Sequence, residues 1–331
     1  MSNANVNPAH LRNGKQISVA NSRNIEGAII EAGLDWEVGL EPKYGRSPEG
    51  EYFKLSGEYN TRIIRLDTQK DLGSVSPEGQ YNVLQNRRAF DFFQRFLDQG
   101  KAELWTAGSI RGGKGIYITA KINSESEIVT GDVVSQYVVL SNWHNAKRGV
   151  TANYLPYRRK CFNTLAWTSY QDGSIHNLNQ LTATSSYGVG IAHNNKLGQI
   201  LSAAEEKIEM AQEAFDYAVN QYRQMAGVPI TQPEELKEYF VEVFSLETKE
   251  LKDESTKEAK LLQQLMQNYS SGIGLGGQET QNYWGAYNSV TQFLEHQSGR
   301  NVSSQVQKSL FDRQTAQLRQ RAHTIAVKVS L

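Results

Sequence analysis

Cysteine, long apolar runs and net charge are what this sequence lacks. Its 331 residues include a single cysteine, Cys161, so no disulfide can form within the chain and no cysteine cluster can hold a metal. A lone cysteine fits a reducing compartment. No run approaches the roughly 18 apolar residues that a membrane span requires. Residues 1–17 are polar and rich in asparagine, unlike a signal peptide. We therefore expect a cytoplasmic protein without a membrane contact.

The formal net charge is zero, with 35 basic and 35 acidic residues, which argues against a dedicated DNA-binding domain. The charges are nevertheless segregated along the chain. Residues 141–161 carry five basic residues and no acidic one, whereas residues 202–260 carry fourteen acidic and seven basic residues. Because salt screens charges beyond about 10 Å, a local basic surface can bind phosphate even on a neutral protein.

The hydrophobic pattern predicts an α+β fold, with an antiparallel β-meander flanked by helices in the first half and a mostly helical second half. We divide the chain into a flexible arm at 1–25, an α+β core with basic hairpins at 26–200 and a helical region at 201–331. Helices are predicted over Glu26–Trp36 and Tyr81–Leu97. Strands are predicted at 51–55 and 61–66, paired across a turn at 57–60, and at 104–110, 115–122, 133–143 and 150–157.

In the second half, apolar residues from Leu201 to Tyr222 alternate in steps of three and four, which is a heptad seam. The seam predicts either a helix packed in the core or an oligomer contact. Thr231 and Glu234 have capping-box spacing and predict a helix that runs to about Phe244. Residues 272–277 predict a glycine-rich hinge, and helices are expected at 282–295 and 305–321.

Basic residues with neighbouring aromatic residues are the candidate nucleic-acid contacts. Lysine and arginine neutralise phosphates, and aromatic rings stack on bases. Each cluster also has a plain structural interpretation, as a polar turn after a strand, a solvated surface or a hairpin turn that needs its glycines. The candidates lie in the turn 111–115, the segment 141–148 and the segment 157–160. They are Arg111, Lys114, Trp143, Lys147, Arg148, Tyr157, Arg158, Arg159 and Lys160.

No enzyme site is recognisable in the sequence. Cys161 has His144 and His176 nearby in the chain, but nothing holds a nucleophile against a base. The histidines His144, His176 and His193 have no ligand spacing. We expect no catalytic residue, no metal and no cofactor.

Seven short segments of the chain form an ordered set of motifs: Arg65–Asp67, Leu72–Ser76 with Tyr81, Gln85–Phe90, Ala107–Gly113, Arg159–Leu165, Ala192–Asn195 and Trp284–Asn288. In this order they resemble the phage and plasmid protein family known as domain of unknown function nine-three-two, the YfjQ/YafZ-like group. The resemblance spans roughly residues 51 to 296.

The resemblance implies a mobile genetic element but no settled activity. The family often shows Ser-His-Asp-Gly-Ser, where this chain has Asn142-Trp143-His144-Asn145-Ala146, and Ala192 stands where the family has arginine. Acid-dependent chemistry is therefore not carried over. A helix, a β-meander and a following helix are also similar to Rad52-type single-strand annealing proteins, which hold a stretched single strand in a basic groove as rings or filaments.

We therefore predict a protein that binds single-stranded DNA in recombination or replication and assembles as a homo-oligomer. The alternative is a protein-interaction module, such as an inhibitor of host defence, which the zero net charge, the acidic helical half and the heptad seam favour. A hydrolase or nuclease that uses His144 and His193 is a third hypothesis.

Overall fold

The computed structural model describes most of the chain, and the candidates Lys147, Arg148 and Lys160 lie outside the described residues, as do Cys161, His176 and His193. The heptad seam before residue 212 and the glycine-rich segment 272–277 also lie outside. The structure describes residues 16–75, 83–144, 150–159, 163–165, 188–191, 212, 214–247, 249–271, 281–298 and 302–331.

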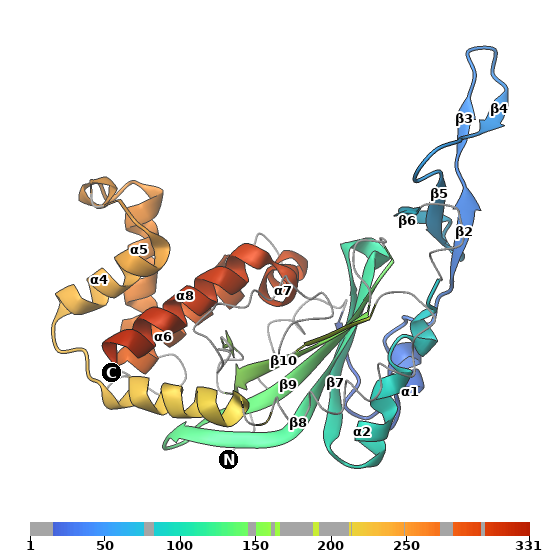
Figure 1. The fold of residues 1–331 in the computed structure, drawn as a ribbon. Helices are drawn as coiled ribbons and strands as arrows, with labels where there is room; N and C mark the ends of the chain where they lie inside the picture. The colour runs from blue at the N-terminus through green and yellow to red at the C-terminus, as the bar shows by residue number, and fades with distance from the viewer. Residues whose placement is uncertain are drawn as a thin grey trace.

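The centre of the molecule is an antiparallel sheet of seven strands, in which four successive strands form a meander (Figure 1). The predicted α+β fold with a β-meander in the first half is therefore confirmed. The last strand of the meander pairs with two more short strands, and the first strand of the sheet comes from the N-terminal segment. The strands are β1 (Gln16–Ser18), β7 (Ala102–Ile110), β8 (Gly115–Val129), β9 (Asp132–Trp143), β10 (Val150–Arg158), β11 (Asn163–Thr164) and β12 (Gly188–Ile191).

Both faces of the central strands are buried. Val138 and Leu140 of β9 pack in one hydrophobic cluster with Phe93, from the short helical segments that precede β7. Tyr137 and Val139 point to the other side, because side chains alternate along a strand. That side is covered by the C-terminal helices, with Val139 in a cluster that Leu310 also contacts. The helical segments on the first side are α1 (Ile25–Glu31), the 3₁₀ turns η2 (Asn86–Arg88) and η3 (Asp91–Phe93), and α2 (Gln94–Asp98).

The N-terminal region is more ordered than the sequence predicts. Residues 16–18 pair with β7, Val19 is fully buried and α1 begins at Ile25, so the described residues 16–25 are not the flexible arm that the sequence predicts. The helix predicted over Tyr81–Leu97 is instead broken into two 3₁₀ turns and one short helix. Asn86 explains part of this break, because its buried amide donates to the backbone carbonyl oxygens of Leu34 and Trp36.

A separate group of short strands projects from one end of the central sheet (Figure 1). The predicted pairing of 51–55 with 61–66 is wrong. Each segment is a strand, but each finds another partner: β4 pairs with β3, whereas β5 lies between β2 and β6. Val38 of β2 and Ile63 of β5 are buried in the same hydrophobic cluster as Phe93. Their burial favours the pairing of β5 with β2 over the predicted pairing with residues 51–55. These strands are β2 (Val38–Pro42), β3 (Tyr44–Arg46), β4 (Tyr52–Lys54), β5 (Thr61–Arg65) and β6 (Lys70–Val75).

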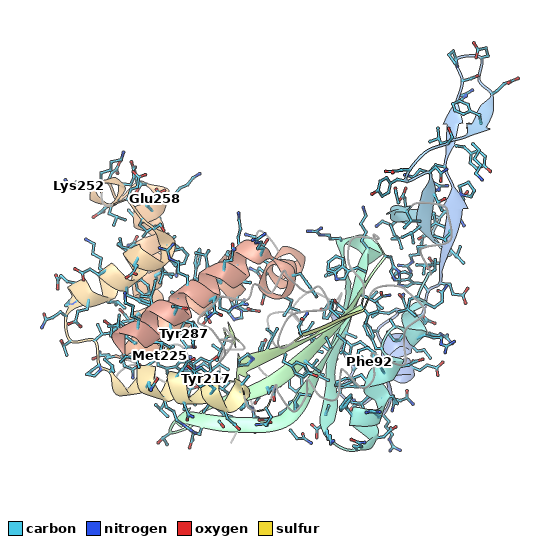
Figure 2. The ribbon with its side chains drawn as sticks, in the orientation of Figure 1. Phe92, Tyr217, Met225, Lys252, Glu258 and Tyr287 are labelled. Carbon is cyan, nitrogen blue, oxygen red and sulfur yellow. The ribbon has the colours of Figure 1, made fainter. Side chains whose placement is uncertain are left out.

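The second half is helical and has its own core, in which Tyr222, Trp284 and Tyr287 pack together. Tyr287 and Met225 lie between these helices, and Lys252 and Glu258 lie at their outer end (Figure 2). No helix among the described residues is long and apolar enough to cross a membrane. The helices are residues 214–227, α4 (Pro233–Phe244), the 3₁₀ turn η5 (Glu250–Lys252), α5 (Lys257–Ser270), α6 (Tyr283–Gln292) with the π-helical turn η7 (Phe293–Gln297), α7 (Val302–Phe311) and α8 (Arg313–Val329).

The helix boundaries differ from the prediction in two places. Gln232, not Thr231, precedes the first turn of α4, and the Thr231 backbone N–H donates to the carboxylate of Glu235. The helix predicted at 305–321 is two helices, because Asp312 caps α8 with its side chain. Phe215 and Tyr222 of the heptad seam are fully buried in the helical core, so the described part of the seam is an intramolecular contact.

Replacing His323 with phenylalanine should remove a pH dependence of stability. The ring lies edge-on to Tyr222, and neither of its nitrogens has a hydrogen-bond partner among the described residues. Burial lowers the pKa of His323 from 6.5 to about 3. Between these values the unfolded chain binds a proton that the folded protein excludes, so stability falls as the pH falls, by up to about 1.4 kcal/mol per pH unit.

Urea denaturation at a series of pH values measures this slope. His323→Phe should lose less stability than the unsubstituted protein between pH 6.5 and pH 4. An unchanged slope in His323→Phe would contradict the assignment.

Candidate nucleic-acid interface

The turn between β7 and β8 brings cations from two distant parts of the sequence together. Arg111, Gly112 and Gly113 all have positive φ, at 50°, 68° and 96°. Two of the three are glycines, which adopt this left-handed backbone without strain. A side chain at Gly112 would overlap the Nζ atom of Lys70, so the ammonium group of Lys70 lies directly against this turn.

The cations at this turn are exposed or partly exposed. Lys70 and Arg111 are exposed and Lys114 is partly exposed, and we name Lys70, Arg111 and Lys114 the basic turn. Among the described residues, neither Lys70 nor Lys114 forms an ion pair. Asp71 follows Lys70 in β6, where successive side chains point to opposite faces. The structure thus supports the predicted position of Arg111 and Lys114 at a tip, and it adds Lys70, which lies 41 positions before Arg111 in the chain.

The described residues that flank Lys147 and Arg148 lie at the end of the sheet that carries the basic turn. The backbone N–H of His144 donates to the carbonyl oxygen of Lys114 at 2.9 Å. Thr151, near the start of β10, is paired with Ser141 near the end of β9. The described residues on both sides of the segment are therefore at the same end of the sheet as the basic turn.

Arg158 is not a surface residue, and its predicted role as a phosphate contact is wrong. Its side chain is 1% exposed, and its Nε donates to both carboxylate oxygens of Asp132, at 2.8 and 2.9 Å. The guanidinium group lies 5.6 Å from the ring centroid of Trp284, whose indole N–H donates to Asp132 at 2.8 Å. The alternation along β10 turns Arg158 to the side opposite Tyr157 and Arg159, where the helical core covers it.

Arg159 is half exposed but already has an acidic neighbour, Glu125, at 3.4 Å. Lys121 also pairs with this carboxylate, at 2.5 Å. Burial raises the pKa of Glu125, but hydrogen bonds from Lys121 and Ser135 outweigh it, so the pKa lies below its ordinary value. Glu125 is therefore ionised and neutralises much of this cluster.

Of the five basic residues of segment 141–161, Arg158 and Arg159 lie in the described part of the chain, and these two do not share a surface. Arg159 follows the last residue of β10 and is paired with Glu125. Arg158 faces the opposite side and is neutralised by Asp132.

Trp143 and His144 are buried, so neither offers an open surface. Trp143 is 2% exposed, and its indole lies edge-on to Phe311 of α7, so its predicted role as a stacking surface is also wrong. His144 is fully buried, with Nε2 2.7 Å from the Asn86 side-chain oxygen and its ring against Trp36. No group of three or more potential metal ligands occurs in the part of the chain that the structure describes.

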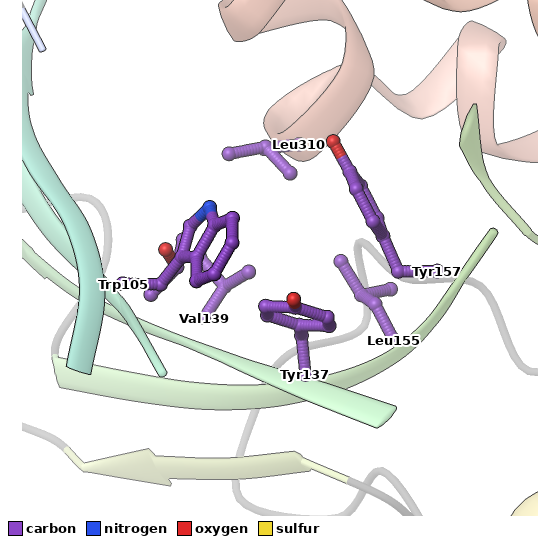
Figure 3. Close-up of a pocket in the computed structure, with 7 residues that line it drawn as sticks. Trp105, Tyr137, Val139, Leu155, Tyr157 and Leu310 are labelled. Carbon is purple, nitrogen blue, oxygen red and sulfur yellow. The ribbon is translucent and has the colours of Figure 1, made fainter. Parts of the chain in front are cut away.

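Tyr157 lines an apolar recess on the sheet, where α7 approaches it. Figure 3 shows Tyr137 at the base, between Trp105 and Tyr157, with Leu310 of α7 above them. The cavity within the recess is small, about 20 Å³. The ring centroids of Trp105 and Tyr137 are 5.8 Å apart, and those of Tyr137 and Tyr157 are 5.2 Å apart. Burial raises the pKa of the Tyr137 hydroxyl, which therefore stays a proton donor.

A β-bulge places Trp105 in this recess. The register between β7 and β8 shifts between Leu104 and Thr106, so that Trp105 and Thr106 both turn toward the same side of the sheet. Trp105 and Tyr137 were not among the residues predicted to bind a ligand, because each has the pattern of an ordinary strand residue. The density of aromatic residues on adjacent strands was the only sequence feature that pointed to the recess.

The fold is an antiparallel sheet covered by helices on both sides, with cations at one end and an aromatic recess near the other. The chain matches the family described as Domain of unknown function (DUF932) over residues 71–320, and it therefore belongs to this family. No curated protein and no solved structure matches the chain.

Replacing Asp132 with asparagine should strongly destabilise the protein. The substitution leaves the buried charge of Arg158 without its counter-charge, which typically costs roughly 3–5 kcal/mol. Glu247→Gln, which removes the partner of the exposed Lys249, should cost less than about 1 kcal/mol. Chemical denaturation measures the free energy of unfolding of both variants. A loss in Asp132→Asn as small as the loss in Glu247→Gln would show that the buried pair is dispensable.

Proposed function

We propose that this protein binds nucleic acid, with single-stranded DNA as its ligand, at the end of the sheet that carries the basic turn. The observation that supports this most directly is that the ammonium group of Lys70, from β6, lies against the turn that carries Arg111 and Lys114. Among the described residues, neither Lys70 nor Lys114 has an ion-pair partner. An anionic ligand would supply a counter-charge to these lysines and would relieve the repulsion between like charges at the turn.

The chemistry of the contact follows from these side chains. Arginine donates to two phosphate oxygens at once, whereas lysine acts as a point charge. Each phosphate that is neutralised releases counterions, so affinity falls as salt rises. Lys147 and Arg148 remain candidates for the same surface. They lie outside the described residues, in the chain between β9 and β10, whose described ends are at this end of the sheet.

The aromatic recess supports a single-stranded ligand over a duplex. Tyr137 and Tyr157 are 8% and 6% exposed, so Trp105, which is partly exposed, is the member of the recess that offers ring surface to an unpaired base. Base stacking on aromatic side chains tolerates any sequence. The bases of a duplex are stacked on one another and would have to be extruded first. The recess lies on the same sheet as the basic turn, so one extended strand could contact both.

Single-strand annealing in recombination or replication is the specific activity that we propose. It requires no cofactor, because two strands pair once they are held extended with their bases accessible. A ring or filament of copies would hold a longer strand, and its contacts would lie outside the described part of the heptad seam, which is buried within the chain. The reaction would take place in the cytoplasm, without a membrane.

A protein-interaction module, such as an inhibitor of host defence, is the second candidate. Exposed aromatic residues on the projecting strands favour it, because large exposed apolar groups often mark interfaces. The acidic helical half would suit a basic partner.

The triple variant Lys70→Ala, Arg111→Ala, Lys114→Ala should weaken binding of an oligothymidylate and flatten its salt dependence. Each lost phosphate contact lowers the slope of log affinity against log salt by about 0.7, so three contacts lower it by about 2. Fluorescence anisotropy titrations at several salt concentrations measure both quantities.

The matched control removes three exposed lysines from the acidic helices, with Lys237→Ala, Lys252→Ala and Lys260→Ala. It changes the net charge by the same amount and should leave the slope as it is in the unsubstituted protein. The proposal fails if the unsubstituted protein does not bind oligothymidylate at low salt, or if both variants change the slope equally.

A further inference from the structure

The strands β3 and β4 form a two-stranded ribbon that projects away from the body of the protein (Figure 1). Its aromatic side chains are unusually exposed: Tyr44 is 57% exposed, Tyr52 74% and Phe53 51%. Neither the basic turn nor the recess accounts for them. Aromatic residues are costly to leave in water, so their exposure on a projecting element points to a ligand.

The register of the ribbon places aromatic and basic residues together on one face. Tyr44 is directly opposite Lys54, and Arg46 is directly opposite Tyr52. Residues opposite one another in an antiparallel pair point to the same side. The guanidinium group of Arg46 lies 5.8 Å from the ring centroid of Tyr52. We name Tyr44, Arg46, Tyr52 and Lys54 the ribbon face.

The other side of the ribbon has a structural role. Phe53 lies opposite Gly45, and a side chain at Gly45 would collide with the Phe53 ring and approach Leu55. Phe53 and Leu55 thus cover the bare backbone of Gly45. Glu51 alternates onto the Phe53 side. The side of the ribbon with Phe53 and Leu55 therefore stabilises it, whereas the ribbon face on the other side is exposed.

The acidic residues at the tip of the ribbon do not neutralise the ribbon face. The carboxylate of Glu49 accepts hydrogen bonds from the Glu49 backbone N–H and from Ser47, and these lower its pKa. This carboxylate is therefore engaged within the turn. The ribbon face itself has two cations, two aromatic rings and no carboxylate.

We propose that the ribbon face is a second binding site for single-stranded nucleic acid, in which Tyr44 and Tyr52 stack on bases while Arg46 and Lys54 contact the flanking phosphates. This inference rests on the proposed function and extends it to a separate element. Alternating rings and cations match the alternation of bases and phosphates along a single strand. A protein partner would need apolar and acidic groups alternating in the same order, whereas every nucleotide has both a ring and a charge.

The ribbon and the basic turn are joined through the small sheet. Lys43, which begins the ribbon, donates through its Nζ to the Ser74 hydroxyl of β6, the strand that also carries Lys70. A strand bound on the ribbon face can therefore continue toward the basic turn. Two linked contacts on one ligand raise the affinity of each, because the second is formed at high effective concentration.

Two probes of equal length separate stacking from charge: an oligothymidylate and an oligodeoxynucleotide with abasic sites throughout. The full chain with Tyr44→Thr and Tyr52→Thr should bind the oligothymidylate about tenfold or more weakly, as expected for lost stacking. Its affinity for the abasic probe and its salt slope should not change. Threonine keeps a high preference for strands, so the ribbon should remain folded.

The conservative variant Tyr44→Phe with Tyr52→Phe keeps both rings and should retain the affinity for oligothymidylate. The triple variant of the basic turn should lower the affinity for both probes by the same factor. This result separates failure of this inference from failure of the proposed function. The inference is overturned if the threonine variant binds oligothymidylate normally while the basic-turn variant does not. It is also overturned if the threonine variant changes only the mass of the oligomer, since the ribbon face would then contact a second copy of this chain.

Discussion

The buried contact between Asp132 and Arg158 constrains the rest of the structure. Asp132 begins β9, Arg158 ends β10, and the indole of Trp284 in α6 completes the group with a hydrogen bond to Asp132. A buried charge requires a geometrically matched counter-charge, because each partner alone would pay a large desolvation cost. The contact therefore joins the end of the meander to the helical half in one arrangement. It also takes Arg158 away from solvent.

The covered sheet limits where a polyanion can bind. Tyr137 and Val138 are neighbours in β9, yet both are nearly buried, since helical segments pack on each face. A groove across an open sheet face, as a fold-level analogy would suggest, is therefore not what the described residues form. The exposed chemistry lies at turns and projections: the basic turn, the mouth of the recess and the ribbon face. The binding that we propose at these places would combine point contacts with phosphates and stacking on bases.

Local patterns predicted the elements well wherever the residues decided their own conformation. The meander strands follow from β-branched and aromatic runs, and the turn at Gly112 and Gly113 needs a positive φ that glycine provides. The end of α4 at Phe244 was also predicted. Prediction failed where a distant group decided the outcome. Asn86 bonds across about 50 positions to break a predicted helix, and Val38 displaces the predicted partner of β5.

The amino-acid sequence by itself determined the α+β class, the meander and the family, because these depend on local periodicity and ordered motifs. Only the tertiary structure decided which cations face solvent. The sequence shows Arg158, Arg159 and Lys114 as equivalent positive charges. Packing buries Arg158 against Asp132, pairs Arg159 with Glu125 and leaves Lys114 partly exposed at the turn against which Lys70 lies. The physical reason is that charge acts through space, and the separations between these residues are set by the folded chain.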